Sequence, residues 1–218
     1  MSAEDLYELM RTQRAIRRLR PDPIPDDVLQ RIKQAAAWAP SGGNQQPWRM
    51  ILVRDPARKQ RMAELYSVRW AAYTDGYTQR YGDAPESVRA TIARTIAAGD
   101  YLAANMGDYP VVAVVCFNPK LMAITDAELD RPSVVGGGSV YLAVQNLLLA
   151  CRAEGVGCVL TTLLCMDEPE VRELLNIDPQ WYTAAHIPMG YPVGGGYGPT
   201  SRQAAADMFY EDEWGNPA

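Results

Sequence analysis

Apolar residues along this chain alternate between the spacing of amphipathic helices and the unbroken runs of buried strands. After Asp26 they recur every three or four positions up to Pro40, which predicts a helix that ends at the proline. The stretch 111–117 is instead continuously apolar and rich in valine, which is typical of a strand buried on both faces. By the same criteria we expect helices at 2–12, 56–105 with breaks near Gly82 and Pro85, 139–154 and 168–175, and strands at 49–53, 156–162 and 183–189.

Long helical stretches separate the predicted strands, and the Gly and Pro residues divide the chain into short elements without an internal repeat. We therefore expect one layered α+β or α/β domain that spans residues 1–218. The helix at 139–154 is apolar on most of its sides, and one face of a four-stranded sheet cannot cover all of them. This pattern predicts that the helix is buried in the middle of the protein or of an oligomer.

The composition narrows the classes of function. The chain has 218 residues, a net charge of −5 and a pI near 5.0, which disfavours general binding to the phosphate backbone of nucleic acids. No apolar run approaches the roughly 20 residues of a membrane span, and the N-terminus lacks the apolar region of a signal peptide. We expect no nucleic-acid partner, no membrane span and a cytoplasmic location.

The chain offers few side chains for catalysis of its own. Its four cysteines lie in apolar surroundings, and no two of them have the spacing of a zinc or redox motif. The one histidine, His186, lies in an apolar run, where we expect a hydrogen-bonded residue of a strand. A serine triad or a multi-histidine metal site has too few residues, so we expect no metal, no catalytic side chain and chemistry that comes from a cofactor.

Three segments hold more polar or charged side chains than a simple connection needs. Residues 14–18 include three arginines, which taken alone would more often form a solvated basic patch. Residues 39–48 read APSGGNQQPW, and this string can serve as a turn, but its amide side chains and its tryptophan exceed what a turn requires. Residues 198–202 form a predicted loop with one cation, Arg202.

The order of these segments resembles the nitroreductase family of FMN-dependent oxidoreductases. The string at 39–48 and the sequence NLLLA at 146–150 carry the resemblance most specifically, and it continues through 190–192 to Arg202. It implies a three-layer α+β fold, with a mixed and mainly antiparallel sheet flanked by helices, in an intertwined homodimer that holds FMN at the subunit interface. It also implies NAD(P)H as co-substrate and a ping-pong hydride transfer through flavin N5, with nitroaromatic, quinone or similar electron-poor small molecules as acceptors.

The resemblance also assigns roles to individual positions. Two arginines would bind the FMN phosphate, which carries about −1.5 to −2 charges near neutral pH, and a third would lie at the N1 and O2 edge of the flavin. The partner subunit would lend a loop to the flavin, and further residues would reach its ribityl chain and N5. Arg14 and Arg202, with the neighbouring Ala15, match the phosphate-binding positions, and Arg17 matches the position at the N1 and O2 edge. The loop from the partner subunit corresponds to Pro40, Ser41, Gly42 and Asn44. Ser139 matches the position at the ribityl chain, and Thr161 and Thr162 match the stretch that reaches N5.

Three positions depart from the common pattern of the family. Gln13 stands where many relatives have a further arginine, Ala15 where they often have serine, and Thr200 where some have lysine. Binding of the phosphate would therefore depend more heavily on Arg14 and Arg202, and Arg18 could compensate.

A stripe of aromatic residues allows two interpretations, and a second group of large apolar residues lies near the C-terminus. A stripe at helical spacing, made of Tyr66, Trp70, Tyr73, Tyr77 and Tyr81, either packs the helix on the domain or faces the flavin groove, where Trp70, Tyr73 and Tyr77 would line the substrate pocket. The second group, Met208, Phe209, Tyr210 and Trp214, is predicted to belong to an arm that embraces the partner subunit.

Other functions remain open at this point. The chain could be a flavin-binding sensor or storage protein without efficient turnover, or a family member specialised for dehalogenation or dehydrogenation. From its elements alone it could also be a nonenzymatic α+β dimer whose arginines are surface charge.

Overall fold

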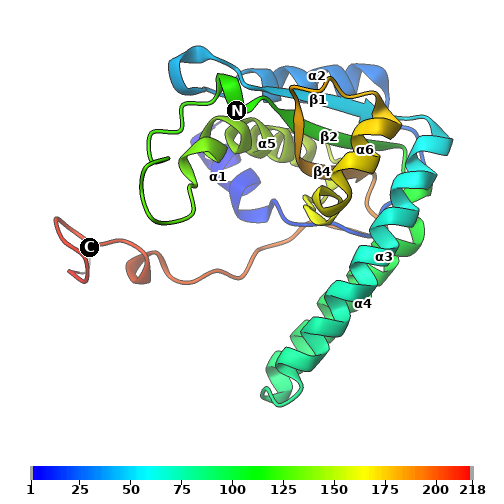
Figure 1. Ribbon diagram of the computed structural model, residues 1–218. Helices are drawn as coiled ribbons and strands as arrows, with labels where there is room; N and C mark the ends of the chain where they lie inside the picture. The colour runs from blue at the N-terminus through cyan, green and yellow to red at the C-terminus, as the bar shows by residue number, and fades with distance from the viewer. Residues whose placement is uncertain (1, 217–218) are drawn as a thin grey trace.

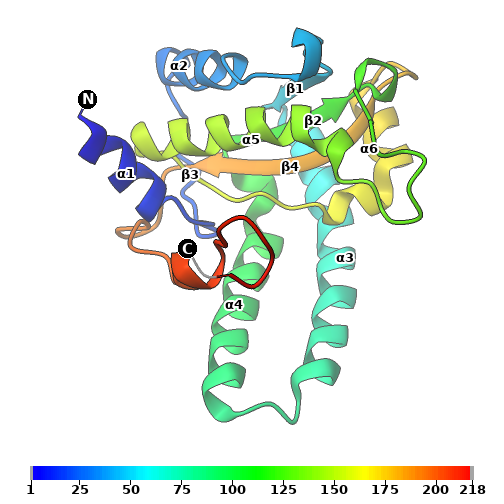
Figure 2. The same cartoon turned by 90° about the vertical axis from the view of Figure 1, so that its left-hand side faces the viewer.

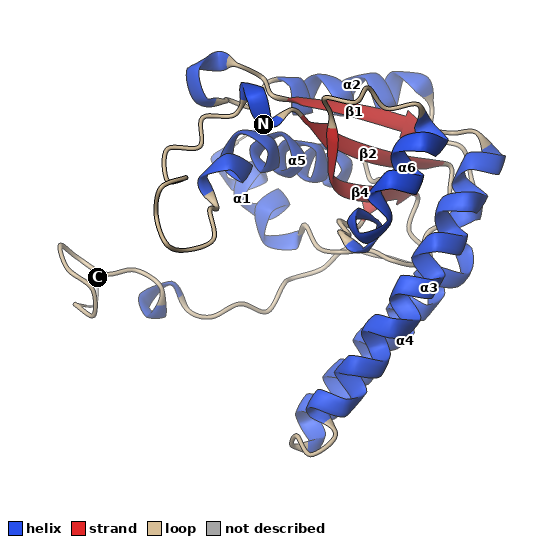
Figure 3. Cartoon of the chain, viewed as in Figure 1, coloured by secondary structure: helices blue, strands red, loops and turns tan. Residues whose placement is uncertain are grey.

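The computed structural model describes residues 2–216, apart from the side chains of residues 78 and 79. Figure 1 shows the arrangement of its helices and strands, and Figure 3 colours them by type. The helices are α1 (Ala3–Thr12), α2 (Asp26–Ala37), α3 (Pro56–Tyr81), α4 (Glu86–Asn105), α5 (Val135–Ala153) and α6 (Glu168–Leu175). The strands are β1 (Trp48–Val53), β2 (Val111–Phe117), β3 (Gly157–Cys158) and β4 (Tyr182–Gly190).

The four strands form one sheet in the order β1-β2-β4-β3, and each neighbouring pair is antiparallel. In this register Met50 pairs with Val115, and Val114 pairs with His186. Strand β2 lies between β1 and β4 and is buried along almost its whole length, as its valine-rich sequence predicts. The predicted α+β class with a mainly antiparallel sheet is confirmed.

Alternate residues of the strands point into two separate apolar clusters, one on each face of the sheet. One face, which includes Val114 and Cys116, packs against Tyr66, Leu102 and Val171 from α3, α4 and α6. The opposite face packs against α2 and α5. The chain is therefore built in three layers, with the sheet in the middle (Figures 1 and 2). No helix in the described part is long and apolar enough to cross a membrane.

Two predicted boundaries differ from the structure. Helix α5 begins at Val135 and not at residue 139, so it includes three consecutive glycines; a Cβ on Gly136 would lie 2.9 Å from Met122 Cε, which explains the need for a small residue there. Strand β3 covers only Gly157–Cys158 and not 156–162. The hydrogen-bonded ladder between β3 and β4 is interrupted opposite Pro188, because proline has no N–H to donate. In the described residues only the bridge between Thr161 and His186 continues this ladder.

Helices α3 and α4 form an antiparallel hairpin whose outer half extends away from the three layers in both views (Figures 1 and 2). Asp55 caps α3 by accepting a hydrogen bond from the N–H of Arg58, and Pro56 occupies the first turn. The helices approach closely where Trp70 of α3 faces Gly99 of α4. A Cβ on Gly99 would lie 1.9 Å from Trp70 Cζ2, so only glycine fits at this position.

Replacing Gly99 by alanine is expected to lower the free energy of unfolding by about 1 to 3 kcal/mol, because the new methyl group overpacks the contact with Trp70. Helix propensity alone would favour alanine over glycine by about 1 kcal/mol. A loss of stability would therefore have the opposite sign to the effect of helix propensity. Gly76→Ala is the matched control in α3, since a Cβ there meets no described atom within 4 Å, and it should raise stability slightly. Urea unfolding of both variants tests this, and equal stability would contradict the packing argument.

His186 differs from its sequence-based prediction. It lies on β4 with 0% of its surface exposed, but neither ring nitrogen has a hydrogen-bond partner among the described residues. The expected hydrogen-bonded histidine is therefore wrong. Burial disfavours the charged imidazolium and lowers the pKa of His186 from 6.5 to about 4.

Stability should consequently depend on pH through this residue. Between pH 6.5 and 4 the unfolded chain binds a proton on His186 that the folded chain does not, so stability falls as the pH is lowered across that range. The full loss in the free energy of unfolding is about 3 kcal/mol. Because the chain has one histidine, the difference between the urea-unfolding profiles of the wild type and His186→Leu isolates this imidazole. Parallel profiles from pH 7 to 4 would show that the imidazole is not responsible.

Candidate functional site

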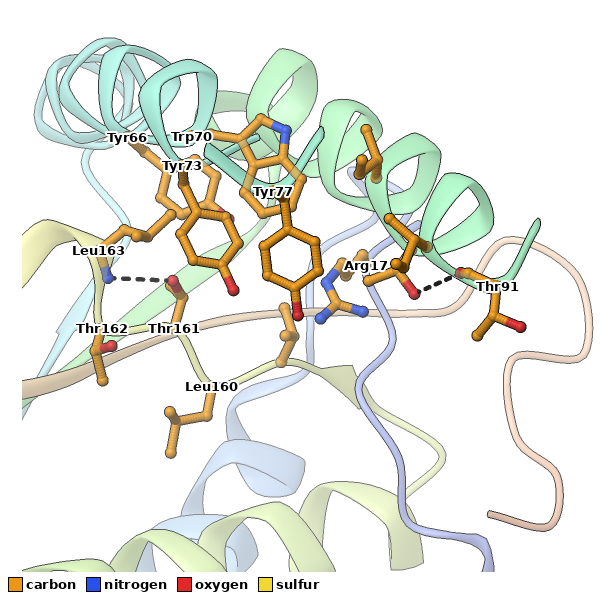
Figure 4. A pocket seen from close by; sticks show the side chains of 14 residues that line it. Arg17, Tyr66, Trp70, Tyr73, Tyr77, Thr91, Leu160, Thr161, Thr162 and Leu163 are labelled. Carbon is orange, nitrogen blue, oxygen red and sulfur yellow. Dashed lines mark hydrogen bonds between the residues drawn. The ribbon is translucent and has the colours of Figure 1, made fainter. Parts of the chain in front are cut away.

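A cavity of about 410 Å³ lies between the α3–α4 hairpin and residues 159–163, which follow β3 (Figure 4). Helix α3 contributes Tyr66, Trp70, Tyr73 and Tyr77; helix α4 contributes Thr91, Ile92, Thr95 and Ile96; and Arg17 contributes from the N-terminal segment. The wall is thus mostly aromatic and aliphatic, with hydroxyl groups and a single guanidinium. No Asp, Glu or Lys is among the described residues that line it.

The aromatic stripe on α3 forms a continuous series of ring contacts along this cavity. Successive ring centroids lie 6.3 Å apart for Tyr66 and Trp70, 5.7 Å for Trp70 and Tyr73, and 5.3 Å for Tyr73 and Tyr77. The indole N–H of Trp70 donates to the Asp100 carboxylate at 2.7 Å, which fixes the ring against α4. Tyr66 and Trp70 are buried in the core, as the packing interpretation predicts, and the same rings also line the cavity; that this cavity is the flavin groove stays a prediction.

Arg17 and Thr161 supply polar side-chain atoms to the cavity. In Figure 4 the rings of Tyr73 and Tyr77 extend from α3 towards these two residues. Burial raises the pKa of Tyr66, while a hydrogen bond with Thr161 and the nearby Arg17 cation partly offset that rise. The Tyr77 pKa is also raised, because Tyr73 and Tyr81 lie beside it. These phenols remain protonated at neutral pH and can act as hydrogen-bond donors.

The arginine segment reaches the cavity because its backbone joins the edge of the sheet. The N–H of Ile16 donates to the carbonyl of Cys158 at 2.9 Å, and the N–H of Arg20 donates to the carbonyl of Tyr191 at 2.8 Å. Leu19 forms a bridge with Pro192, and its side chain is buried. Within this extended segment Ile16 and Leu19 point into the core, and Arg17 lines the cavity.

The chain that follows β4 returns to the N-terminal segment near Arg14, a few residues before Arg202. The N–H of Thr200 donates to the carbonyl of Arg11 at 3.3 Å, and a Cβ on Gly198 would lie 3.9 Å from Arg14 Nη1. Within residues 2–216 neither Arg14, Arg17 nor Arg202 has an acidic partner; Arg202 bonds only the carbonyl of Ser201. Ala15 is exposed beside them. Three arginines without a carboxylate are therefore available to an anion.

The loop predicted to serve a partner subunit lies elsewhere. The N–H of Gly42 donates to Ser139 Oγ of α5 at 3.0 Å, and Ser41 Oγ accepts from the N–H of Gln46. Asn44 has a φ of 55°, a conformation that asparagine tolerates better than most residues. Pro40 and Asn44 are exposed. Ser139 thus lies with this loop, on the α5 face of the sheet, and not with Arg14 and Arg202.

The predicted cofactor residues consequently form two groups within one chain. Arg17 lies beside the α3–α4 hairpin and Arg14 near Gly198 of the chain that leads to Arg202, whereas the loop lies against α5. Thr161 lines the cavity of about 410 Å³, and Thr162 lines both this cavity and a second one of about 380 Å³ beside α5. The first group with its cavity suits a planar ring that carries a phosphate, because unpaired guanidinium groups bind phosphate and the aromatic and aliphatic walls accept the ring.

The sequence did not reveal the residues that α4 contributes. Thr91, Ile92, Thr95 and Ile96 lie on one face of the helix, at a spacing of four, but nothing in their order indicated that this face returns to the cavity. Tyr109, whose hydroxyl bonds the carbonyl of Arg17, was also missed.

Comparisons with known proteins agree with this architecture. Residues 10–191 match the family model described as "Nitroreductase family". The chain is 29% identical to an NADH dehydrogenase of Thermus thermophilus, over 85% of each protein, and 28% identical to a 5,6-dimethylbenzimidazole synthase of Rhodobacter capsulatus, over 86% of this chain and 83% of the relative. A solved iodotyrosine deiodinase bound to FMN and 3-iodo-L-tyrosine has a TM-score of 0.64 and 23% identity, covering 91% of this chain and 94% of that one.

Proposed function

The chain belongs to the nitroreductase family of FMN-dependent oxidoreductases, and from this premise we propose that it uses NAD(P)H to reduce a small, electron-poor molecule such as a quinone or a nitroaromatic compound. The observation that carries the proposal is the cavity with aromatic walls that Arg17 lines without an acidic partner; within residues 2–216 Arg14 and Arg202 have none either. The cytoplasmic location and the single domain over residues 1–218 stay predictions of the sequence.

The residues present fit FMN, and different residues would hold its phosphate and its ring. Arg14 and Arg202 would bind the phosphate through charge-assisted hydrogen bonds. Arg17 would place a cation beside the ring, where negative charge is stabilised, and Thr161 and Thr162 would offer polar atoms at the floor of the cavity. When bound, FMN supplies the two-electron chemistry between NAD(P)H and the acceptor. No side chain of the cavity is required as an acid or a base.

The cavity walls favour an uncharged planar acceptor over an amino acid. Rings such as Tyr73 and Tyr77 can stack on a planar aromatic molecule, and their hydroxyls can donate to its oxygen atoms. A free amino acid such as the 3-iodo-L-tyrosine of the similar deiodinase structure carries an ammonium group, and the described lining of this cavity holds no carboxylate to pair with it. Quinones and nitroaromatics, which carry no ammonium group, are therefore the first acceptors to test.

A second copy of the chain would complete the site. The outer face of α5 leaves Tyr141 and Leu142 exposed by 42% and 47%, on a helix that is apolar on most of its sides. The C-terminal tail runs away from the three layers in Figure 1, and Trp214 on it is 90% exposed. A homodimer would cover both surfaces, and it would bring the Pro40–Asn44 loop of one subunit to the flavin of the other.

The visible absorption spectrum of the purified protein, followed by anaerobic addition of NADH or NADPH, tests the proposed activity. We expect flavin bands that bleach with a reduced nicotinamide and return when a quinone is added. Bands that do not bleach would replace this proposal with a flavin-binding sensor or storage protein. A colourless protein that cannot be reconstituted with FMN would overturn it.

Arg14→Ala and Arg202→Ala should each weaken FMN binding by about 1.5 to 3 kcal/mol, because each removes a charge-assisted bond to the phosphate. Equilibrium titration with FMN, followed by the quenching of flavin fluorescence, measures the change. Arg54→Ala is the matched control, since Arg54 follows β1 and pairs with the exposed Asp26. Unchanged FMN affinity in both Arg14→Ala and Arg202→Ala would remove these residues from the phosphate site.

A further inference from the structure

The place of the Arg17 guanidinium depends on its backbone, because this side chain has no hydrogen-bond or ion-pair partner within residues 2–216. The neighbouring residues are tied to the sheet edge: the N–H of Ile16 donates to the carbonyl of Cys158, and the carbonyl of Arg18 accepts from the N–H of Val193, both at 2.9 Å. The carbonyl of Arg17 itself is bonded by a side chain from another part of the chain, the Tyr109 hydroxyl, at 2.7 Å.

Tyr109 is a rigid anchor for this bond. It connects the short 3-10 helix at Met106–Asp108 to β2, and only 1% of its surface is exposed. The buried ammonium of Lys59, from the first turns of α3, donates to the Tyr109 carbonyl and holds its backbone in place. Burial raises the pKa of Tyr109, so the phenol keeps its proton and remains a donor at neutral and mildly alkaline pH.

The hydroxyl therefore connects the core beneath α3 to the arginine that faces the cavity. Without it, the Arg17 carbonyl loses the one described bond that fixes it, while the bonds of Ile16 and Arg18 remain. Rotation of the peptide at Arg17 would then displace the start of its side chain, and the guanidinium would no longer be held at a single position in the cavity. A small displacement of a cation near a ring changes both binding and the charge stabilisation that it provides.

We propose that Tyr109 is a positioning residue, which acts through Arg17 to set the affinity and the reduction potential of the bound flavin. The proposal rests on the proposed function of the same site. It distinguishes Tyr109 from the buried Tyr66, which lines the cavity beside Arg17, because within residues 2–216 it is the Tyr109 hydroxyl that bonds the Arg17 carbonyl.

A double-mutant cycle between Tyr109 and Arg17 tests the proposal. Tyr109→Phe keeps the ring that fills the core and removes only the hydroxyl; a thermal melt confirms that it folds. We expect its FMN dissociation constant to rise about three- to tenfold and its flavin midpoint potential to become more negative. In the Arg17→Ala background, Tyr109→Phe should have little further effect on either quantity, because the residue through which it acts is gone.

Ser67→Ala is the matched control, because it removes another hydroxyl that bonds a backbone carbonyl, that of Ala103 in α4, and Ser67 does not line the cavity. It should lower the melting temperature and leave the FMN dissociation constant within twofold of the wild type. Additive effects of Tyr109→Phe and Arg17→Ala, an unchanged affinity and potential in Tyr109→Phe, or an equal loss in Ser67→Ala would each overturn the positioning role. A wild type that binds no FMN would instead overturn the proposed function and this inference with it.

Discussion

The close approach of residues 16–20 to strands β3 and β4 is the constraint on which the site depends. A Cβ on Gly157 would lie 2.7 Å from Leu19 Cδ2, and a Cβ on Gly190 would lie 3.0 Å from the carbonyl oxygen of Arg20. Because both residues are glycines, the backbone of the arginine segment can bond to the sheet edge at Cys158 and Tyr191. The two glycines thus determine where Arg17 enters the cavity, although neither glycine lines the cavity.

The division of the predicted cofactor residues into two groups is the basis for the proposed homodimer. One chain places Arg17 beside the α3–α4 hairpin and its amide-rich loop against Ser139 of α5. Each group alone is incomplete for a cofactor with a phosphate at one end and a large ring at the other. The exposed apolar side chains of α5 and of the tail supply surface for the contact that would join the two groups.

Most of the fold followed from local patterns, and the parts that did not follow depend on contacts between distant residues. Strands β1, β2 and β4 lie within two residues of their predicted bounds, because their apolar runs have a single interpretation. Strand β3 ends early because of Pro188, which belongs to its partner strand and not to the run itself. The ring of His186, which has no partner among the described residues, and the bond from Tyr109 to Arg17 likewise depend on tertiary packing. The arginine and loop segments were predicted through their order along the chain, whereas the contribution of α4 to the cavity required the geometry of the hairpin.

The most direct test of the account is whether one flavin needs two chains. One differently tagged subunit would carry Arg14→Ala with Arg202→Ala, and the other would carry Gly43→Val, at a loop glycine with a φ of 57° that a branched residue does not tolerate. In the purified heterodimer one site would receive both defects and the other neither, so the account predicts one tightly bound FMN per dimer, against none in either mutant homodimer. A heterodimer that binds no FMN tightly would place both groups of residues in a site within a single chain and contradict the account.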